Sequence, residues 1–191
     1  MIVLTGGIGS GKSVVARILR LKGFGVFDCD YEARRLMHDD GRLKDEIMEV
    51  TGSDVYDGEG NLKRKTLGDR IFGDESLRGK VNRAVHESVR RRMKEWLAEN
   101  DANIFVETAI AHESGIAAEG EAIWCVTASE KTRVKRVKAR DERDGEEIER
   151  IIKIQANEER ELERYGNVYR IDNDGDQPLL PVIEELLKTI K

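Results

Sequence analysis

The sequence contains few of the residues that stabilise small disulfide-rich or metal-centred folds. Its 191 residues include two cysteines, Cys29 and Cys125, which are too few for a disulfide framework or a four-cysteine zinc site. Proline is equally scarce. The sequence has two prolines, Pro178 and Pro181, and both lie near the end of the chain. No proline-rich linker therefore divides the sequence. The length predicts one domain over residues 1–191, at about 150 residues per domain.

Long apolar runs are also missing. The longest has five residues, 122–126, whereas a membrane-spanning helix needs about 20. The apolar start, residues 1–5, is too short for the hydrophobic region of a signal peptide and is followed by glycines. We therefore expect a cytoplasmic protein with no membrane partner. Cys125 lies inside the longest apolar run and is expected to be buried.

Aromatic residues make up 5% of the chain, so the core is expected to be mainly aliphatic. Charged residues make up 37%, yet they nearly balance and leave a net charge of −5. A negative balance argues against a general nucleic-acid-binding protein. We expect no nucleic-acid partner, and a monomer or a weak homo-oligomer.

Short apolar runs alternate with helical patterns along most of the chain. Apolar runs on both faces are typical of parallel strands that helices cover. The alternation predicts an α/β fold with a doubly wound, five-stranded parallel sheet. The expected strands are residues 1–4, 25–27, 103–107, 121–127 and 167–171.

Two segments depart from this alternation. Residues 43–100, approximately, have no convincing strand and are rich in helix formers, so they are interpreted as a helical insertion. Residues 130–164, approximately, are helical and strongly charged, with a weak break at Asp144-Gly145. They are interpreted as a lid with its flanking helices.

Residues 6–13 match the pattern Gly-x-x-x-x-Gly-Lys-Ser in full, between an apolar strand and a helical pattern. In this loop glycines turn the backbone so that successive N–H groups face phosphate oxygens, and the helix N-terminus favours the negative charge. Lys12 would reach the β and γ phosphates, and the Ser13 hydroxyl would bind Mg²⁺. The predicted nucleotide-binding residues are Gly7, Ile8, Gly9, Ser10, Gly11, Lys12, Ser13 and Val14.

The loop alone leaves the class of nucleotide enzyme open. A GTPase would need Asn-Lys-x-Asp to bind guanine, and the sequence has no such motif. An ATPase motor usually carries an acidic residue at the end of a longer apolar strand. Glu107 partly resembles such a residue, so this alternative is not excluded.

Two carboxylates, Asp28 and Asp30, follow the second expected strand. Ligands of doubly wound sheets bind at the carboxyl ends of the strands. One of the two could therefore take a proton from an attacking hydroxyl or hold a water bound to Mg²⁺. The alternative for Asp30 is a structural one, as the N-cap of the following helix.

Two groups of basic residues have helical spacing. Arg83, His86 and Arg90 would share one face of a helix in the insertion, and Arg133, Arg136 and Arg140 one face after the fourth strand. Such faces bind anionic ligands or are simply solvated. Ion pairing with glutamates on a surface helix is a plausible alternative for Arg133.

Together these motifs resemble the dephospho-CoA kinase family, in order and over nearly the whole chain, from Met1 to about Lys188. Residues 5–13 read Thr-Gly-Gly-Ile-Gly-Ser-Gly-Lys-Ser, and 28–30 read Asp-Cys-Asp with Ala33-Arg34 after them. The further matching segments are Gly-x-Leu-x-Arg at 60–64, His-x-x-x-Arg at 86–90, Arg-x-x-x-Arg-Asp at 136–141, Arg150, Gln155, and Asp-Asn-Asp-Gly at 172–175.

The resemblance implies a P-loop kinase that uses ATP and Mg²⁺ to phosphorylate the ribose 3′-hydroxyl of dephospho-CoA. It implies catalytic roles for Lys12, Asp30 and Arg140. It also implies that Arg140 and Asn173 bind the nucleotide, with Asn173 near the adenine. The implied acceptor-binding residues are Asp30, Arg34, Arg64, His86 and Arg90.

Some positions depart from the family pattern. Val14 stands where the family often has threonine, Glu87 where it has proline, and residues 109–113 where it tends to Pro-Leu-Leu-Phe-Glu. Two other functions stay open beside the implied one. They are a nucleoside monophosphate kinase and a P-loop protein that binds nucleotide as a switch without catalysis.

Overall fold

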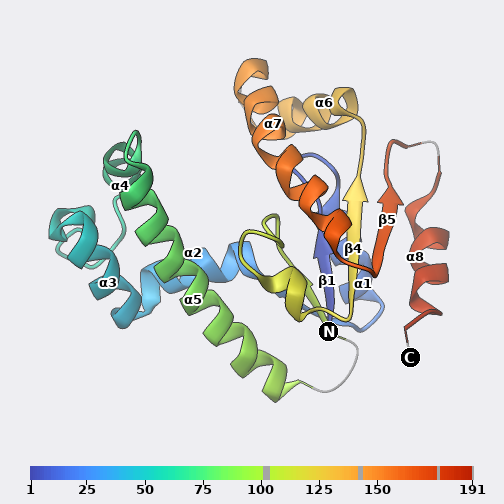
Figure 1. The fold of residues 1–191 in the computed structure, drawn as a ribbon, viewed down its shortest axis with the longest axis horizontal. Coiled ribbons are helices and arrows are strands. Elements are labelled where there is room, and N and C mark those ends of the chain that lie inside the picture. Colours follow the sequence, from blue (N-terminus) through green and yellow to red (C-terminus); the bar gives the residue numbers. More distant parts are fainter. Residues whose placement is uncertain (101–103, 142–143, 176, 191) are drawn as a thin grey trace. The chain divides into compact units, whose positions relative to one another are not determined.

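The computed structural model describes residues 1–100, 104–141, 144–175 and 177–190 (Figure 1). A five-stranded sheet with the order β2-β3-β1-β4-β5 lies at its centre, and every neighbouring pair of strands is parallel. This confirms the predicted α/β class with a five-stranded parallel sheet. The strands are β1 (Ile2–Thr5), β2 (Gly25–Asp28), β3 (Ile104–Glu107), β4 (Ala122–Thr127) and β5 (Val168–Asp172).

Apolar runs of the sequence form the three central strands. All residues of β1 and β3 are buried, as are the four middle residues of β4, which fits parallel strands covered on both faces. The observed strand ends agree with the expected ones to within about a residue. Asn103, which was included in the third expected strand, lies outside the described residues.

The chain divides into two compact units. Unit 1 comprises Met1–Asp28 and Glu99–Lys191, and unit 2 comprises Cys29–Ala98. Besides the sheet, unit 1 holds α1 (Lys12–Leu21), η2 (Ile116–Glu119), α6 (Glu130–Arg140), α7 (Gly145–Glu161), η3 (Leu162–Arg164) and α8 (Leu179–Leu187). Unit 2 holds α2 (Cys29–Asp39), α3 (Gly41–Thr51), η1 (Ser53–Val55), α4 (Arg64–Ile71) and α5 (Glu75–Glu99), the last of which ends one residue past the boundary.

The core of unit 1 lies between the sheet and helices α1 and α8. Leu4, Leu19, Trp124 and Ile183 are fully buried in it, and Phe105 meets Trp124 edge-on at 5.0 Å between ring centroids. Such a core stabilises the strands whose carboxyl ends carry the site. Cys125 is buried as expected, and burial raises the pKa of its thiol to about 11.

Unit 2 is helical apart from an isolated bridge between Tyr56 and Leu62. It starts before the expected beginning of the insertion at about residue 43, because tertiary contacts tie α2 to the helices that follow. Tyr56 donates a hydrogen bond to the carbonyl of Met37 at 2.9 Å, and Arg91 pairs with Asp40 at 2.6 Å. Nothing in its residue pattern had separated α2 from the nucleotide-binding fold.

The expected break in the charged segment 130–164 is present. Helix α6 ends at Arg140, and α7 begins at Gly145 with Asp144 as its N-cap, which accepts a hydrogen bond from the Gly145 amide at 2.7 Å. Figure 1 shows α6 beyond the carboxyl end of β4. Within the described ranges, no helix has the length and the apolar character needed to cross a membrane.

Candidate active site

The phosphate loop connects β1 to α1, as the sequence predicts. Its residues 6–11 lie between Thr5, the last residue of β1, and Lys12, the first of α1. Gly11 is left-handed, with φ of 97°, and a Cβ atom on it would collide with the amide nitrogen of Asn173. Glycine is therefore required at this position both for the backbone angle and for the space.

A buried carboxylate lies under the loop's lysine and serine. Glu107, the last residue of β3, is 2% exposed, and β3 pairs directly with β1. Its Oε1 atom lies 2.9 Å from Lys12 Nζ and 3.1 Å from Ser13 Oγ, and its Oε2 atom lies 3.6 Å from an Arg20 nitrogen. Two cations thus compensate the desolvation of this carboxylate.

Glu107 lies at the candidate site although the sequence pattern alone gave it no role there. In the sequence, its position at the end of an apolar strand only partly resembles the acidic residue of an ATPase motor. The signal that could have identified it is the combination of an acidic residue, a buried parallel strand and a phosphate loop at the neighbouring strand.

Asn173 and Arg136 contact backbone carbonyls of the phosphate loop. Asn173 is 8% exposed, and its side-chain amide donates to the Ser10 carbonyl at 2.7 Å. Arg136 donates to the Asn173 carbonyl at 2.7 Å and reaches the carbonyls of Gly9 and Ser10 at 3.4 Å. Asn173, which the sequence predicts to bind the nucleotide, therefore lies at the phosphate loop. Its place beside the adenine stays a prediction.

Arg133 differs from the surface role that helical spacing had made plausible. It is 5% exposed, and its Nε atom donates to the Ile8 carbonyl at 2.9 Å. Gln155 of α7 accepts a hydrogen bond from the Ile8 amide at 2.7 Å. The Ser10 amide donates to the Gly7 carbonyl at 3.1 Å. Two amides of the predicted phosphate-binding set are thus bonded to other groups of the protein.

Arg140 lies at the exposed end of α6. Its side chain is 64% exposed and binds the carboxylate of neighbouring Asp141 at 2.8 and 2.9 Å. This hydrogen bond raises the pKa of Arg140 above its ordinary value, so the residue is a permanent cation. Its contact with a transferring phosphoryl group stays a prediction.

The five predicted acceptor-binding residues all belong to unit 2. Asp30 and Arg34 are exposed and lie one turn apart at the start of α2, and exposed Arg64 is the first residue of α4. His86 and Arg90, both half-buried, lie one turn apart on α5. Because α2 starts at Cys29, Asp30 lies in its first turn, and the N-cap alternative for Asp30 is wrong.

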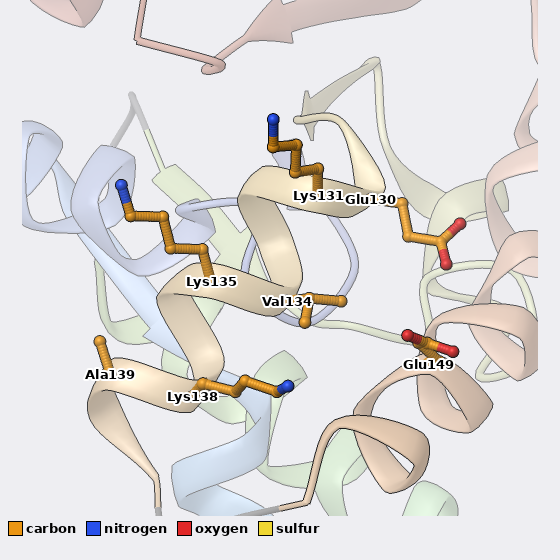
Figure 2. A pocket seen from close by; sticks show the side chains of 7 residues that line it. All are labelled: Glu130, Lys131, Val134, Lys135, Lys138, Ala139 and Glu149. Carbon is orange, nitrogen blue, oxygen red and sulfur yellow. The ribbon is translucent and has the colours of Figure 1, made fainter.

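An open depression of about 820 Å³ lies on α6 and α7. Figure 2 shows the lysines Lys131 and Lys135 extending from α6, with Val134 on the side of Glu149. Its lining residues are Glu130, Lys131, Val134, Lys135, Lys138, Ala139 and Glu149. This depression includes none of the predicted site residues, so it is separate from the phosphate loop.

The residues at the phosphate loop suit a divalent cation that also binds phosphate. Ser13 and Glu107 offer a hydroxyl and a carboxylate, the hard oxygen ligands that Mg²⁺ prefers. The described residues contain no cluster of three or more His, Cys, Asp or Glu side chains that could hold a metal alone. A metal at the phosphate loop would therefore need further ligands from a nucleotide and from water.

A phosphate loop after the first strand, on a parallel sheet of order 2-3-1-4-5, defines a P-loop kinase fold. The profile of one family in this class, dephospho-CoA kinase, matches residues 1–178. The chain belongs to the dephospho-CoA kinase family.

Relatives support this assignment. The dephospho-CoA kinase of Bacteroides fragilis is 36% identical over 186 residues, which cover 96% of this chain and 89% of that protein. A crystal structure of a Thermus thermophilus protein is 32% identical, with a TM-score of 0.80 over 98% of this chain and 94% of that one. Dephospho-CoA kinase from Campylobacter jejuni, at 22% identity, has the same fold, with a TM-score of 0.69 over 98% and 97% of the two chains.

Proposed function

We propose that this chain transfers the γ-phosphoryl group of ATP to the ribose 3′-hydroxyl of dephospho-CoA, giving coenzyme A and ADP. The observation that carries the proposal is the phosphate loop, whose Lys12 and Ser13 meet the buried carboxylate of Glu107 at the adjacent strand end. Membership of the family supplies the acceptor.

On the ATP side, Lys12 begins α1 directly after the phosphate loop, and its ammonium group would bind the β and γ phosphates. Ser13, with Glu107 beside it, would hold Mg²⁺, which when bound neutralises charge on those phosphates. Positioning and electrostatic stabilisation supply most of the catalysis in phosphoryl transfer. Arg140 would add positive charge near the transferring group.

On the acceptor side, Asp30 would orient the 3′-hydroxyl and accept its proton. Dephospho-CoA carries a pyrophosphate, which requires cations or donors to bind it. Arg34, Arg64, His86 and Arg90 would supply these from unit 2. The lid role of residues 130–164, the cytoplasmic location, the absence of nucleic-acid and membrane partners, and a monomeric or weakly oligomeric state stay predictions.

The test is a phosphoryl-transfer assay with ATP and Mg²⁺ in four arms: dephospho-CoA, AMP, CMP and no acceptor. The proposal requires ADP formation that depends on dephospho-CoA, with coenzyme A as the product. Preference for AMP or CMP would identify a nucleoside monophosphate kinase. ATP binding without transfer to any acceptor would indicate a nucleotide switch.

Replacing Arg90 with alanine is expected to raise the KM for dephospho-CoA about tenfold or more, since a charged hydrogen bond contributes ~1.5–3 kcal/mol. The KM for ATP should stay within about twofold, because Arg90 is assigned to the acceptor and not to the phosphate loop. Steady-state kinetics with each substrate varied measures both. Arg78→Ala, which removes an exposed arginine of the same helix, is the control. A rise confined to ATP would assign Arg90 to the nucleotide site.

Replacing Glu107 with glutamine is expected to reduce kcat/KM for ATP about 10–100-fold, the equivalent of ~1.4–2.7 kcal/mol. Glutamine keeps an oxygen for Lys12 and Ser13 but removes the charge that orients both. Kinetics and thermal unfolding should be measured together, with exposed Glu130→Gln as the control. Unchanged kinetics in a folded Glu107→Gln protein would contradict a role at the ATP site.

A further inference from the structure

Helices α6 and α7 hold one residue of the phosphate loop on both sides. The carbonyl of Ile8 accepts a hydrogen bond from Arg133 of α6 at 2.9 Å, and its amide donates to Gln155 of α7 at 2.7 Å. Both partners are distant from Ile8 in the sequence. The position of Ile8, and with it the direction of the neighbouring amides, therefore depends on these two side chains.

Arg133 is itself fixed by an ion pair with the half-buried Glu159. Its Nη1 atom lies 3.1 Å from Oε1 of Glu159, and its side chain is 6% exposed. Glu159 is 26% exposed, and an ion pair with one partly exposed member adds little to stability. Stability alone is thus a poor reason for an arginine at this position, whereas control of the loop's geometry is a sufficient one.

The loop is shaped to admit the arginine. A Cβ atom on Gly7 would collide with Nη2 of Arg133 and lie 3.0 Å from Oε1 of Gln155. Gly7 does not have the positive φ found at Gly6, Gly9 and Gly11. Its missing side chain therefore serves the close approach of these two side chains rather than the backbone angle.

One nitrogen of the Arg133 guanidinium makes no hydrogen bond within the described residues. In the part of the chain that the structure describes, Nη2 of Arg133 is buried and has no hydrogen-bond partner. A buried donor left unpaired is costly, so the approach to Gly7 is maintained against a penalty. The bonds from Nε to Ile8 and from Nη1 to Glu159 maintain it.

We infer that Arg133 is a positioning residue for ATP, which acts through Ile8 and is itself oriented by Glu159. The inference rests on the proposed function, since it assigns to Arg133 the geometry of the loop that binds the ATP phosphates. Arg133 does not touch the nucleotide in this scheme. It fixes Ile8, whose own amide is bonded to Gln155, so that the remaining amides of the loop need no rearrangement when ATP arrives.

The test compares Arg133→Met and Glu159→Gln with Lys135→Met, which removes an exposed cation from the same helix. We expect Arg133→Met to raise the KM for ATP and the Kd for ADP about 10–100-fold, the equivalent of ~1.4–2.8 kcal/mol. Glu159→Gln should raise both by a smaller factor. The KM for dephospho-CoA should change less than about twofold, and Lys135→Met should match the parent protein.

ADP binding, measured by calorimetry, needs no acceptor, so it separates this inference from the proposed function. A parent protein that binds ADP but does not phosphorylate dephospho-CoA would refute the function and leave the positioning role testable. Kd values for ADP within about twofold of the parent in both variants would overturn the inference. So would a lowered melting temperature with equal increases in both KM values, because that is the signature of a structural residue.

If Arg133→Met does not fold, Arg133→Lys replaces it. Lysine keeps the charge but lacks the planar fork that bonds Ile8 and Glu159 together. We then expect weaker ADP binding with normal binding of dephospho-CoA. ADP binding equal to that of the parent protein would overturn the inference.

Discussion

Replacing Lys12 with alanine should reduce phosphoryl transfer about 10²–10³-fold, the usual loss when a preorganised electrostatic group is removed from an active site. Lys12 begins α1 directly after the phosphate loop. Its ammonium group would stabilise the negative charge that develops on the β and γ phosphates as ADP leaves. Binding of ATP should weaken as well. Single-turnover assays with excess protein would separate the loss of binding from the loss of chemistry.

The alanine variant also removes a partner of Glu107, whose carboxylate is 2% exposed. Arg20, 3.6 Å away, still pairs with this buried carboxylate, but loss of the closer cation is expected to lower the stability of the protein as well. Lys12→Ala with Glu107→Gln removes both members of the pair and should regain thermal stability without regaining activity. Lys22→Ala, which removes a surface lysine paired with Glu184, is the matched control. Transfer within about threefold of the parent, under ~1 kcal/mol of barrier, would contradict the phosphate-loop assignment.

Local patterns were sufficient to predict the sheet and the phosphate loop. The apolar residues 2–4 and 123–126 are buried, and this pattern needs no knowledge of distant residues. The loop is equally local, because its glycines, lysine and serine follow each other between one strand and one helix. The break at Asp144-Gly145 was visible for the same reason, as a helix-capping residue before glycine.

The features that local patterns did not predict are tertiary contacts. Arg133 has the spacing of an exposed helix face, yet it is buried because α7 brings Glu159 and the loop brings Ile8 to it. Glu107 lies at the candidate site because β3 pairs with β1, and this pairing places it beside the loop that follows β1. The start of unit 2 at Cys29 likewise depends on contacts between α2 and later residues of the unit, such as the hydrogen bond from Tyr56 to Met37. Spacing along one element does not contain this information.

Asp30 gives the second large expected effect. Asp30→Asn should reduce turnover about 10²–10⁴-fold, the range for a general base, while ATP binding and folding persist. A ribose hydroxyl has a pKa far above 7, so it needs a carboxylate to take its proton as the new P–O bond forms. In phosphoryl transfer this help comes late, and much of the effect is the orientation of the hydroxyl.

The catalytic and the structural contributions of Asp30 differ in the free energy that each can supply. Asp30 is exposed in the first turn of α2, where a negative charge favours the helix by about 0.3–1 kcal/mol. The expected loss of turnover corresponds to ~2.7–5.4 kcal/mol of barrier, which helix stability cannot supply. Asp28 ends β2 two residues earlier, and the chain changes from strand to helix between the two residues. Asp28→Asn should therefore lose less activity. Normal turnover by Asp30→Asn with a lowered melting temperature would make Asp30 a helix-stabilising residue and place the base elsewhere.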